Sequence, residues 1–140
     1  MDKEKYLNFS AANRGRVSDE ELEVIRVLGC SEVLADFLVM NTDFRGIVPS
    51  QISRVVAEYT HYYEDEGASD GVWVLALSDQ RFCLARGWLD SDGLYVDDAG
   101  LDIQYADSVE KCLQLPISYD VDEEYREGLK RSLKKTNLGL

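Results

Sequence analysis

The chain has 140 residues, 45% of them hydrophobic and 10% aromatic, and its formal net charge at pH 7 is −12. This length and apolar content fit a single folded domain and argue against intrinsic disorder. The excess of carboxylates disfavours direct binding to nucleic acid. Three widely spaced cysteines argue against a disulfide framework or zinc cluster, and no apolar run is long enough to span a bilayer, so we expect a soluble cytoplasmic protein.

The negative charge is concentrated in the middle of the chain. Residues 64–125 contain sixteen carboxylates and three basic side chains, which gives a net charge of −13. The 63 residues before this block carry −3, and residues 126–140 carry +4. A field of one sign attracts polycations, so the expected partner is a basic protein.

Residues 1–17 form a polar lead-in that we expect to be loosely ordered, although it contains Tyr6 and Phe9. A helix is predicted to begin after Ser18, because Ser18 and Glu21 have the spacing of a capping box. Acidic residues in the first turn also suit the positive end of the helix dipole.

The whole of residues 18–66 is predicted to be helical. Gly29 interrupts the first helix, and Ser31 can cap a second one that ends near residue 40. A third helix is predicted over residues 49–66, because its apolar side chains follow the spacing of a core-facing stripe: Ile52, Val55, Val56, Tyr59 and Tyr63.

Residues 71–106 predict an antiparallel meander. Turns rich in Asp, Ser and Gly separate short runs of β-branched and aromatic residues. Alternation along these strands puts Trp73 and Phe82 in the core. The expected strands cover residues 72–77, 82–89, 94–96 and 101–106.

Residues 108–135 are predicted to be helical again. Ser108 caps a short helix, and Asp120 with Glu123 forms a capping box for the C-terminal helix. The predicted fold is therefore α+β within one domain, 1–140: an N-terminal three-helix segment, a three- to four-stranded antiparallel meander and two C-terminal helices.

The clearest candidate binding surface lies around the turn that begins at Asp90. Aromatic side chains beside carboxylates can grip Arg and Lys through charge and cation–π contacts. Clustered Asp residues are also compatible with a divalent metal, but the loop lacks the spacing of an EF-hand, so no metal or other cofactor is expected. The candidate partner-binding residues are Trp88, Asp90, Asp92, Tyr95, Asp97, Asp98 and Asp102.

No catalytic residues are predicted, because no set of nucleophile, base and orienting group is visible. His61 is the only histidine. On a helix it would lie beside Glu58 and Asp65, an arrangement typical of surface residues. A small metal-assisted enzyme that uses His61 or the Asp cluster remains an alternative.

Residues 70–110 contain a motif composed of Trp73, Asp79-Gln80-Arg81-Phe82, Trp88-Leu89-Asp90, Gly93 and Ser108-Val109-Glu110. This motif resembles that of a loosely defined set of small, uncharacterised bacterial and phage proteins. Those proteins have Gly in place of Gln80 and Cys in place of Leu89. The resemblance covers under a third of the chain and implies a meander followed by a helix, without implying a function.

Composition and charge favour an acidic binding protein that occupies the basic, nucleic-acid-binding surface of a partner protein. A phage-encoded inhibitor of a host defence, of the anti-CRISPR or anti-restriction type, has this character. A toxin immunity protein that covers a nuclease is the alternative. Homodimerisation is also compatible with the sequence, because the stripe of Leu34, Phe37 and Leu38 suits an interface.

Overall fold

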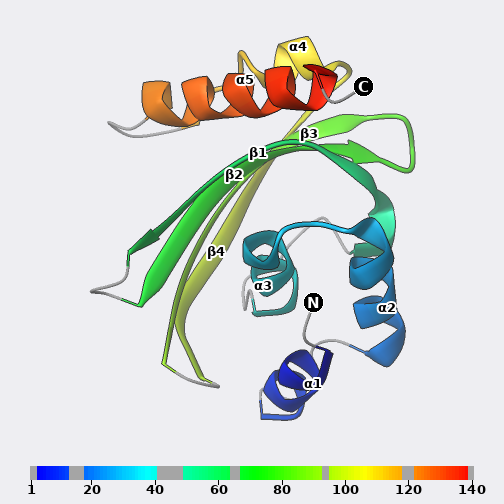
Figure 1. Ribbon diagram of the computed structural model, residues 1–140, viewed down its shortest axis with the longest axis vertical. Coiled ribbons are helices and arrows are strands. Elements are labelled where there is room, and N and C mark those ends of the chain that lie inside the picture. The colour runs from blue at the N-terminus through cyan, green and yellow to red at the C-terminus, as the bar shows by residue number, and fades with distance from the viewer. Residues whose placement is uncertain are drawn as a thin grey trace.

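A computed structural model describes residues 3–12, 18–40, 49–63, 67–92, 95–117 and 122–138. These residues form five α-helices, a short 3-10 helix and one four-stranded antiparallel sheet, arranged as three layers (Figure 1). Helices α1–α3 lie on the inner, concave face of the curved sheet, and α4 and α5 lie on its outer face. The elements are α1 (Lys3–Ala12), α2 (Asp19–Leu28), α3 (Glu32–Met40), η1 (Pro49–Gln51), β1 (Ile52–Tyr63), β2 (Ala68–Leu77), β3 (Phe82–Asp92), β4 (Tyr95–Ala106), α4 (Val109–Cys112) and α5 (Asp122–Leu138).

The sheet confirms the predicted meander and the α+β class. Its strand order is β1-β2-β3-β4, and each strand pairs antiparallel with the next one along the chain. Sequential antiparallel pairing needs only short connections, which agrees with the turn-forming residues between the strands. The sheet contains one strand at each edge, β1 and β4.

Each face of the sheet covers its own hydrophobic core. The inner core joins α1–α3 to side chains of all four strands, with Trp73 and Phe37 in edge-to-face contact at 5.1 Å between ring centroids. The outer core joins the sheet to α4 and α5 and includes Val56, Val72, Val74, Leu84, Cys112, Tyr125 and Leu129. The predicted core residue Trp73 is fully buried, whereas Phe82 is partly buried against the outer core.

The predicted third helix is wrong, because residues 52–63 form the edge strand β1. Pairing with β2 has register shifts between Ile52 and Arg54 and between Val55 and Ala57. Such bulges interrupt the two-residue alternation, so the apolar positions acquire a spacing that resembles a helical stripe. The β-branched and aromatic composition of this segment was the better indicator of its conformation.

Two further expectations need correction. The predicted turn at residues 97–100 lies inside β4, so the expected third and fourth strands are one strand. The lead-in also contains a helix, α1, which is held by a fully buried Tyr6 whose hydroxyl donates to Asp36 at 2.5 Å. Lys5 Nζ lies 3.3 Å from the same carboxylate, so α1 is tied to α3 by polar contacts.

The predicted caps at Ser18, Ser31 and Ser108 are confirmed. Their hydroxyl oxygens accept hydrogen bonds from the backbone amides three residues later, at 3.1, 3.2 and 3.1 Å. Each bond satisfies one of the amides that a helix start leaves without an internal partner. The predicted cap at Asp120 lies outside the described residues.

Candidate functional site

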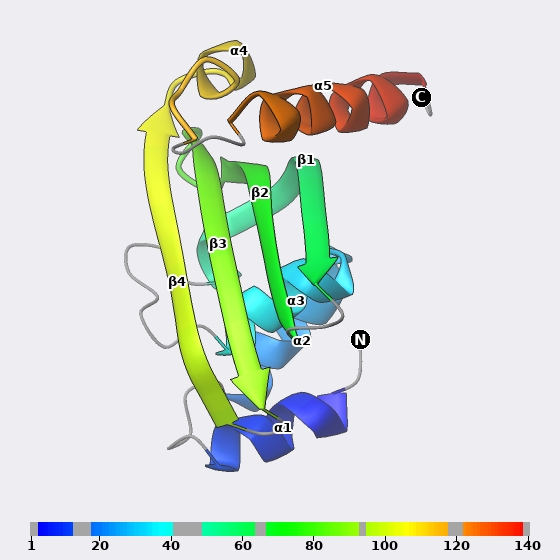
Figure 2. The ribbon, with the colours of Figure 1, turned by 90° about the vertical axis from the view of Figure 1, so that its left-hand side faces the viewer.

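Helices α4 and α5 cover only one end of the outer sheet face (Figure 2). Helix α5 lies mainly over β1, and α4 lies beside β3 and β4. Within the described residues, no helix covers the other end of this face. We call this uncovered area the open face, defined by His61, Tyr63, Trp88, Asp90, Gly100 and Asp102.

The strand register brings these residues to one side of the sheet. Asp70 and Trp88 are paired, as are Trp88 and Gly100, and residues paired across strands project from the same face. Asp70 contacts Tyr125 of α5 and therefore marks this face as the outer one. Asp90 and Asp102 are both exposed, whereas Trp88 is half-buried.

A buried polar cluster lies where α5 meets the open face. The hydroxyl of Tyr125 donates to Asp70 Oδ2 at 2.5 Å, and an Arg86 guanidinium nitrogen lies 3.8 Å from the same oxygen. The guanidinium carbon of Arg86 also lies 5.9 Å from the Tyr125 ring centroid. Asp70 is only 8% exposed, and its Oδ1 has no hydrogen-bond partner among the described residues.

The electrostatics of this cluster favour a neutral tyrosine beside a carboxylate. Burial raises the pKa of Tyr125, and the hydrogen bond and negative charge of Asp70 raise it further. A buried carboxylate needs several donors, because leaving its acceptors unfilled costs free energy. The cluster therefore fixes the start of α5 on β2 and β3.

The indole of Trp88 lies across β4 at Gly100. A Cβ atom added at Gly100 would overlap the six-membered part of the Trp88 ring, so the absence of a side chain at this position makes room for the indole. The guanidinium carbon of Arg86 lies 5.7 Å from the Trp88 ring centroid, which is within cation–π range.

Seven residues were predicted to bind a partner, and the structure describes the side chains of three of them. Trp88, Asp90 and Asp102 all belong to the open face. The other four lie in β3 and β4, with Asp92 paired to Tyr95, Asp98 paired to Asp90, and Asp97 at the register shift. Their side chains are outside the described set.

Sequence reasoning missed Asp70, Arg86, Tyr63 and Tyr125 as members of this region. Tyr63 was assigned to the incorrect third helix. Asp70 precedes Val72 and Val74 with an alternating spacing, so a strand that began two residues earlier would have placed its carboxylate on their face. Arg86 and Trp88 share a face by the same rule.

The predicted placement of Glu58 beside His61 is wrong, and the other predicted neighbour, Asp65, lies outside the described residues. Glu58 lies on the inner side of β1, where its Oε2 accepts hydrogen bonds from the Ser31 hydroxyl and from Trp73 Nε1. His61 instead has the Tyr63 ring 4.4 Å away, centroid to centroid, and both side chains are exposed. His61 therefore has no carboxylate from Glu58 to orient it as a base.

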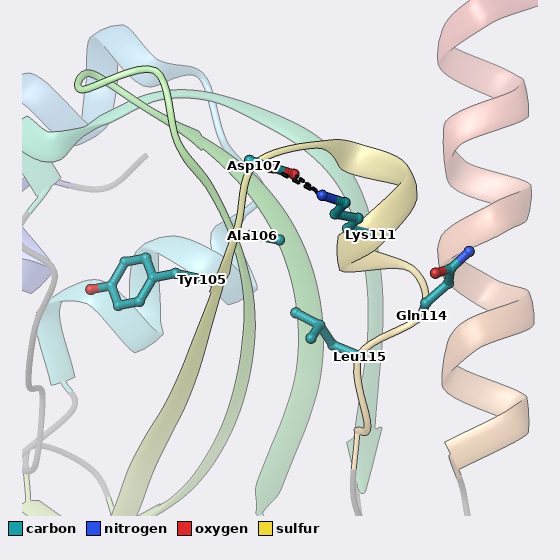
Figure 3. Close-up of a pocket in the computed structure, with 6 residues that line it drawn as sticks. All are labelled: Tyr105, Ala106, Asp107, Lys111, Gln114 and Leu115. Atoms are coloured by element: carbon teal, nitrogen blue, oxygen red, sulfur yellow. Dashed lines mark hydrogen bonds and ion pairs between the residues drawn. The ribbon is translucent and has the colours of Figure 1, made fainter.

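A shallow groove of about 600 Å³ lies at the opposite end of β4, beside α4 (Figure 3). The lining includes an ion pair between Lys111 and Asp107 at 2.9 Å, and its hydrogen bond lowers the pKa of Asp107. In Figure 3, Tyr105 points away from Lys111 and Leu115. The groove is lined by Tyr105, Ala106, Asp107, Lys111, Gln114 and Leu115.

Metal-binding geometry is not found in the described part of the chain. There, no group of three or more His, Cys, Asp or Glu side chains lies close enough to hold a metal ion. The side chains of Asp92, Asp97 and Asp98 lie outside the described set.

Comparisons with known proteins identify no relative. No protein-family model matches the chain, and neither a search of curated proteins nor a search of solved structures finds a similar protein. Among the described helices, none combines the length and the apolar character that are needed to cross a membrane.

Proposed function

We propose that this protein binds a basic partner protein through the open face and covers the surface with which that partner binds nucleic acid. The observation that carries this proposal is the end of the outer sheet face that no described helix covers, where exposed carboxylates lie beside a half-buried indole and the exposed ring of Tyr63. Exposed aromatic and acidic groups on a rigid sheet suit a surface rich in Arg and Lys.

The negative charge of the chain also favours binding to a basic partner. The sequence block that contains β2, β3 and β4 has a net charge of −13, and its field speeds encounter with a basic surface. Carboxylates that occupy cationic groups also exclude phosphates from them, because both anions use the same Lys and Arg donors. Binding of this kind would inhibit the partner without any chemical step.

We propose binding rather than catalysis. The groove beside α4 contains one exposed ion pair, between Asp107 and Lys111, in place of a nucleophile with its base. An inhibitor of a host defence and a toxin immunity protein would both use this binding mode. The gene next to this one distinguishes them, since an immunity gene normally adjoins the gene for its toxin.

The test is affinity capture from the native host at low salt, after nuclease digestion. Three baits are compared: the natural protein, an Asp90→Asn/Asp102→Asn variant, and an Asp79→Asn/Asp107→Asn control. The control removes the same charge from exposed carboxylates outside the open face. Each exposed ionic contact contributes about 0.2–1 kcal/mol, so we expect the first variant to weaken binding about 2- to 30-fold.

Each captured protein is then purified, and its affinity for nucleic acid is measured with and without this protein. We expect the partner to be basic, to be captured less well by the Asp90→Asn/Asp102→Asn bait, and to release nucleic acid when this protein is added. A partner that binds nucleic acid and this protein at the same time would refute the proposal. Equal capture by all three baits would refute it as well.

A further inference from the structure

The open face contains a flat aromatic surface with a fixed position. Trp88 is paired with Asp70 on one side and with Gly100 on the other. Because its ring occupies the space that a side chain at Gly100 would need, the indole lies along the sheet rather than projecting from it. Trp88 is half-buried, so part of this ring remains accessible to a partner.

Exposed carboxylates lie on both sides of the indole along the strand direction. Asp90 follows Trp88 by two residues on β3, and Asp102 follows Gly100 by two residues on β4. The strands are antiparallel, so these two steps run in opposite directions. Positions two residues apart on a strand are separated by about 7 Å. A cation stacked on the indole is therefore within reach of Asp90 on one side and of Asp102 on the other, and Asp102 is paired across the strands with Arg86.

Asp70 lies beside the indole and is already bound by groups of the protein itself, Tyr125 and Arg86. The residue is 8% exposed, lies on the same face, and is paired with Trp88. The Oδ1 atom has no hydrogen-bond partner among the described residues. This atom is enclosed by the protein, so Asp70 offers a partner its negative charge beside the indole rather than a hydrogen-bond acceptor.

The shape of the site distinguishes between the two common cationic side chains. A guanidinium is planar, stacks on aromatic rings and donates to carboxylates through a fork of N–H groups, whereas an ammonium is a compact, strongly hydrated charge. The chain itself has such a contact, since Arg86 lies 5.7 Å from the Trp88 ring centroid. We infer that the open face binds an arginine side chain of the partner, stacked on Trp88 between Asp90 and Asp102.

This inference rests on the proposed function and names the group that is recognised. The test uses fluorescent oligo-arginine and oligo-lysine peptides of equal length as probes, titrated at low salt. The natural protein is compared with Gly100→Ala, which displaces the indole without changing charge, and with Trp88→Leu, which removes it. Ile103→Val on the inner side of β4 is the control, and circular dichroism verifies that each variant is folded.

We expect the natural protein to bind the arginine peptide about three- to ten-fold more tightly than the lysine peptide. Gly100→Ala and Trp88→Leu should abolish this preference and leave the salt dependence of binding unchanged, and Ile103→Val should retain the preference. Tryptophan emission should change when the arginine peptide binds the natural protein but not the Trp88→Leu variant.

Equal affinity for the two peptides, unaffected by Gly100→Ala, would overturn the stacking inference. If Asp90→Asn/Asp102→Asn weakened both peptides in that case, the proposed acidic binding function would remain supported. Failure of both peptides to bind at low salt would overturn the inference and the proposed function together. A preference for arginine that persists in folded Trp88→Leu protein would overturn the role of the indole alone.

Discussion

The hydroxyl of Tyr125 offers the sharpest test of the cluster that joins α5 to the sheet. Tyr125→Phe deletes the group that donates to Asp70 Oδ2 and leaves the carboxylate with Arg86 at 3.8 Å. A hydrogen bond to a charged group contributes about 1.5–3 kcal/mol, and the surrounding burial keeps water from replacing the lost donor. We expect the free energy of unfolding to fall by that amount.

The chain also contains a matched control. The hydroxyl of Tyr59 donates to Glu124 at 2.8 Å, and this contact is exposed. Tyr59→Phe removes the same chemical group, but water can hydrate the carboxylate of Glu124, so the expected loss is about 0.5 kcal/mol or less. Both variants keep the ring contact of 5.4 Å between the centroids of Tyr59 and Tyr125.

Urea unfolding monitored by circular dichroism measures the free energy of unfolding of both variants. For 140 residues, the entropy of unfolding converts 1 kcal/mol into about 3 °C, so Tyr125→Phe should lower the melting temperature by about 5–10 °C. In an Asp70→Asn background the acceptor of this hydrogen bond is neutral. Tyr125→Phe should then lower the free energy of unfolding by only about 0.5–1.5 kcal/mol. Equal losses for Tyr125→Phe and Tyr59→Phe would refute the assignment of Asp70 as a buried carboxylate that depends on Tyr125.

Three more predictions concern stability and are measured by the same unfolding assay. Gly128→Ala should destabilise the protein by more than about 1 kcal/mol although Ala favours helices, because its Cβ would overlap the Tyr59 ring; combined with Tyr59→Ala it should be neutral or stabilising. Burial raises the pKa of Cys83 to about 12, so the folded state keeps a proton that the unfolded thiol loses near pH 9. Cys83 should then lower stability between about pH 9 and 12 by up to about 1.4 kcal/mol per pH unit, in addition to the falls caused by Cys30 and Cys112, and Cys83→Ala should reduce the total slope by that amount; equal slopes would contradict it. Ser18→Ala should cost about 1 kcal/mol by removing the cap of α2, whereas Ser18→Asp should cost far less.

Local chemistry made several elements predictable from the sequence. The serine caps at Ser18, Ser31 and Ser108 depend on contacts within one turn, which a sequence contains directly. The β2–β3 hairpin was predictable because its apolar runs are short and the turn between them is polar. The strand conformation of residues 52–63 was not predictable in this way. Two register shifts in the pairing with β2 change the spacing of the apolar positions along β1.

The binding surface was predicted in part for a related reason. Trp88, Asp90 and Asp102 were selected from composition and turn chemistry, and the register does bring them to one face. The turn chemistry itself was misleading at Gly100, which lies within β4 and makes room for an indole rather than a reversal of the chain. A sequence contains no direct record of which glycine lies beneath an aromatic ring on the neighbouring strand. Asp70 and Tyr125 were missed because they are 55 residues apart in the chain.

The alternation along β2 has a consequence for cooperativity. The strand β2 contributes side chains to both cores: the inner core contains Trp73, Leu75 and Leu77, and the outer core contains Val72 and Val74. Insertion of a single residue near the start of β2 would exchange the two sets of side chains and disrupt both cores at once. Loss of either helical layer likewise exposes the apolar side chains on one face of β2. We therefore expect the two halves of the molecule to unfold in a single transition, without a stable species that retains only one of them.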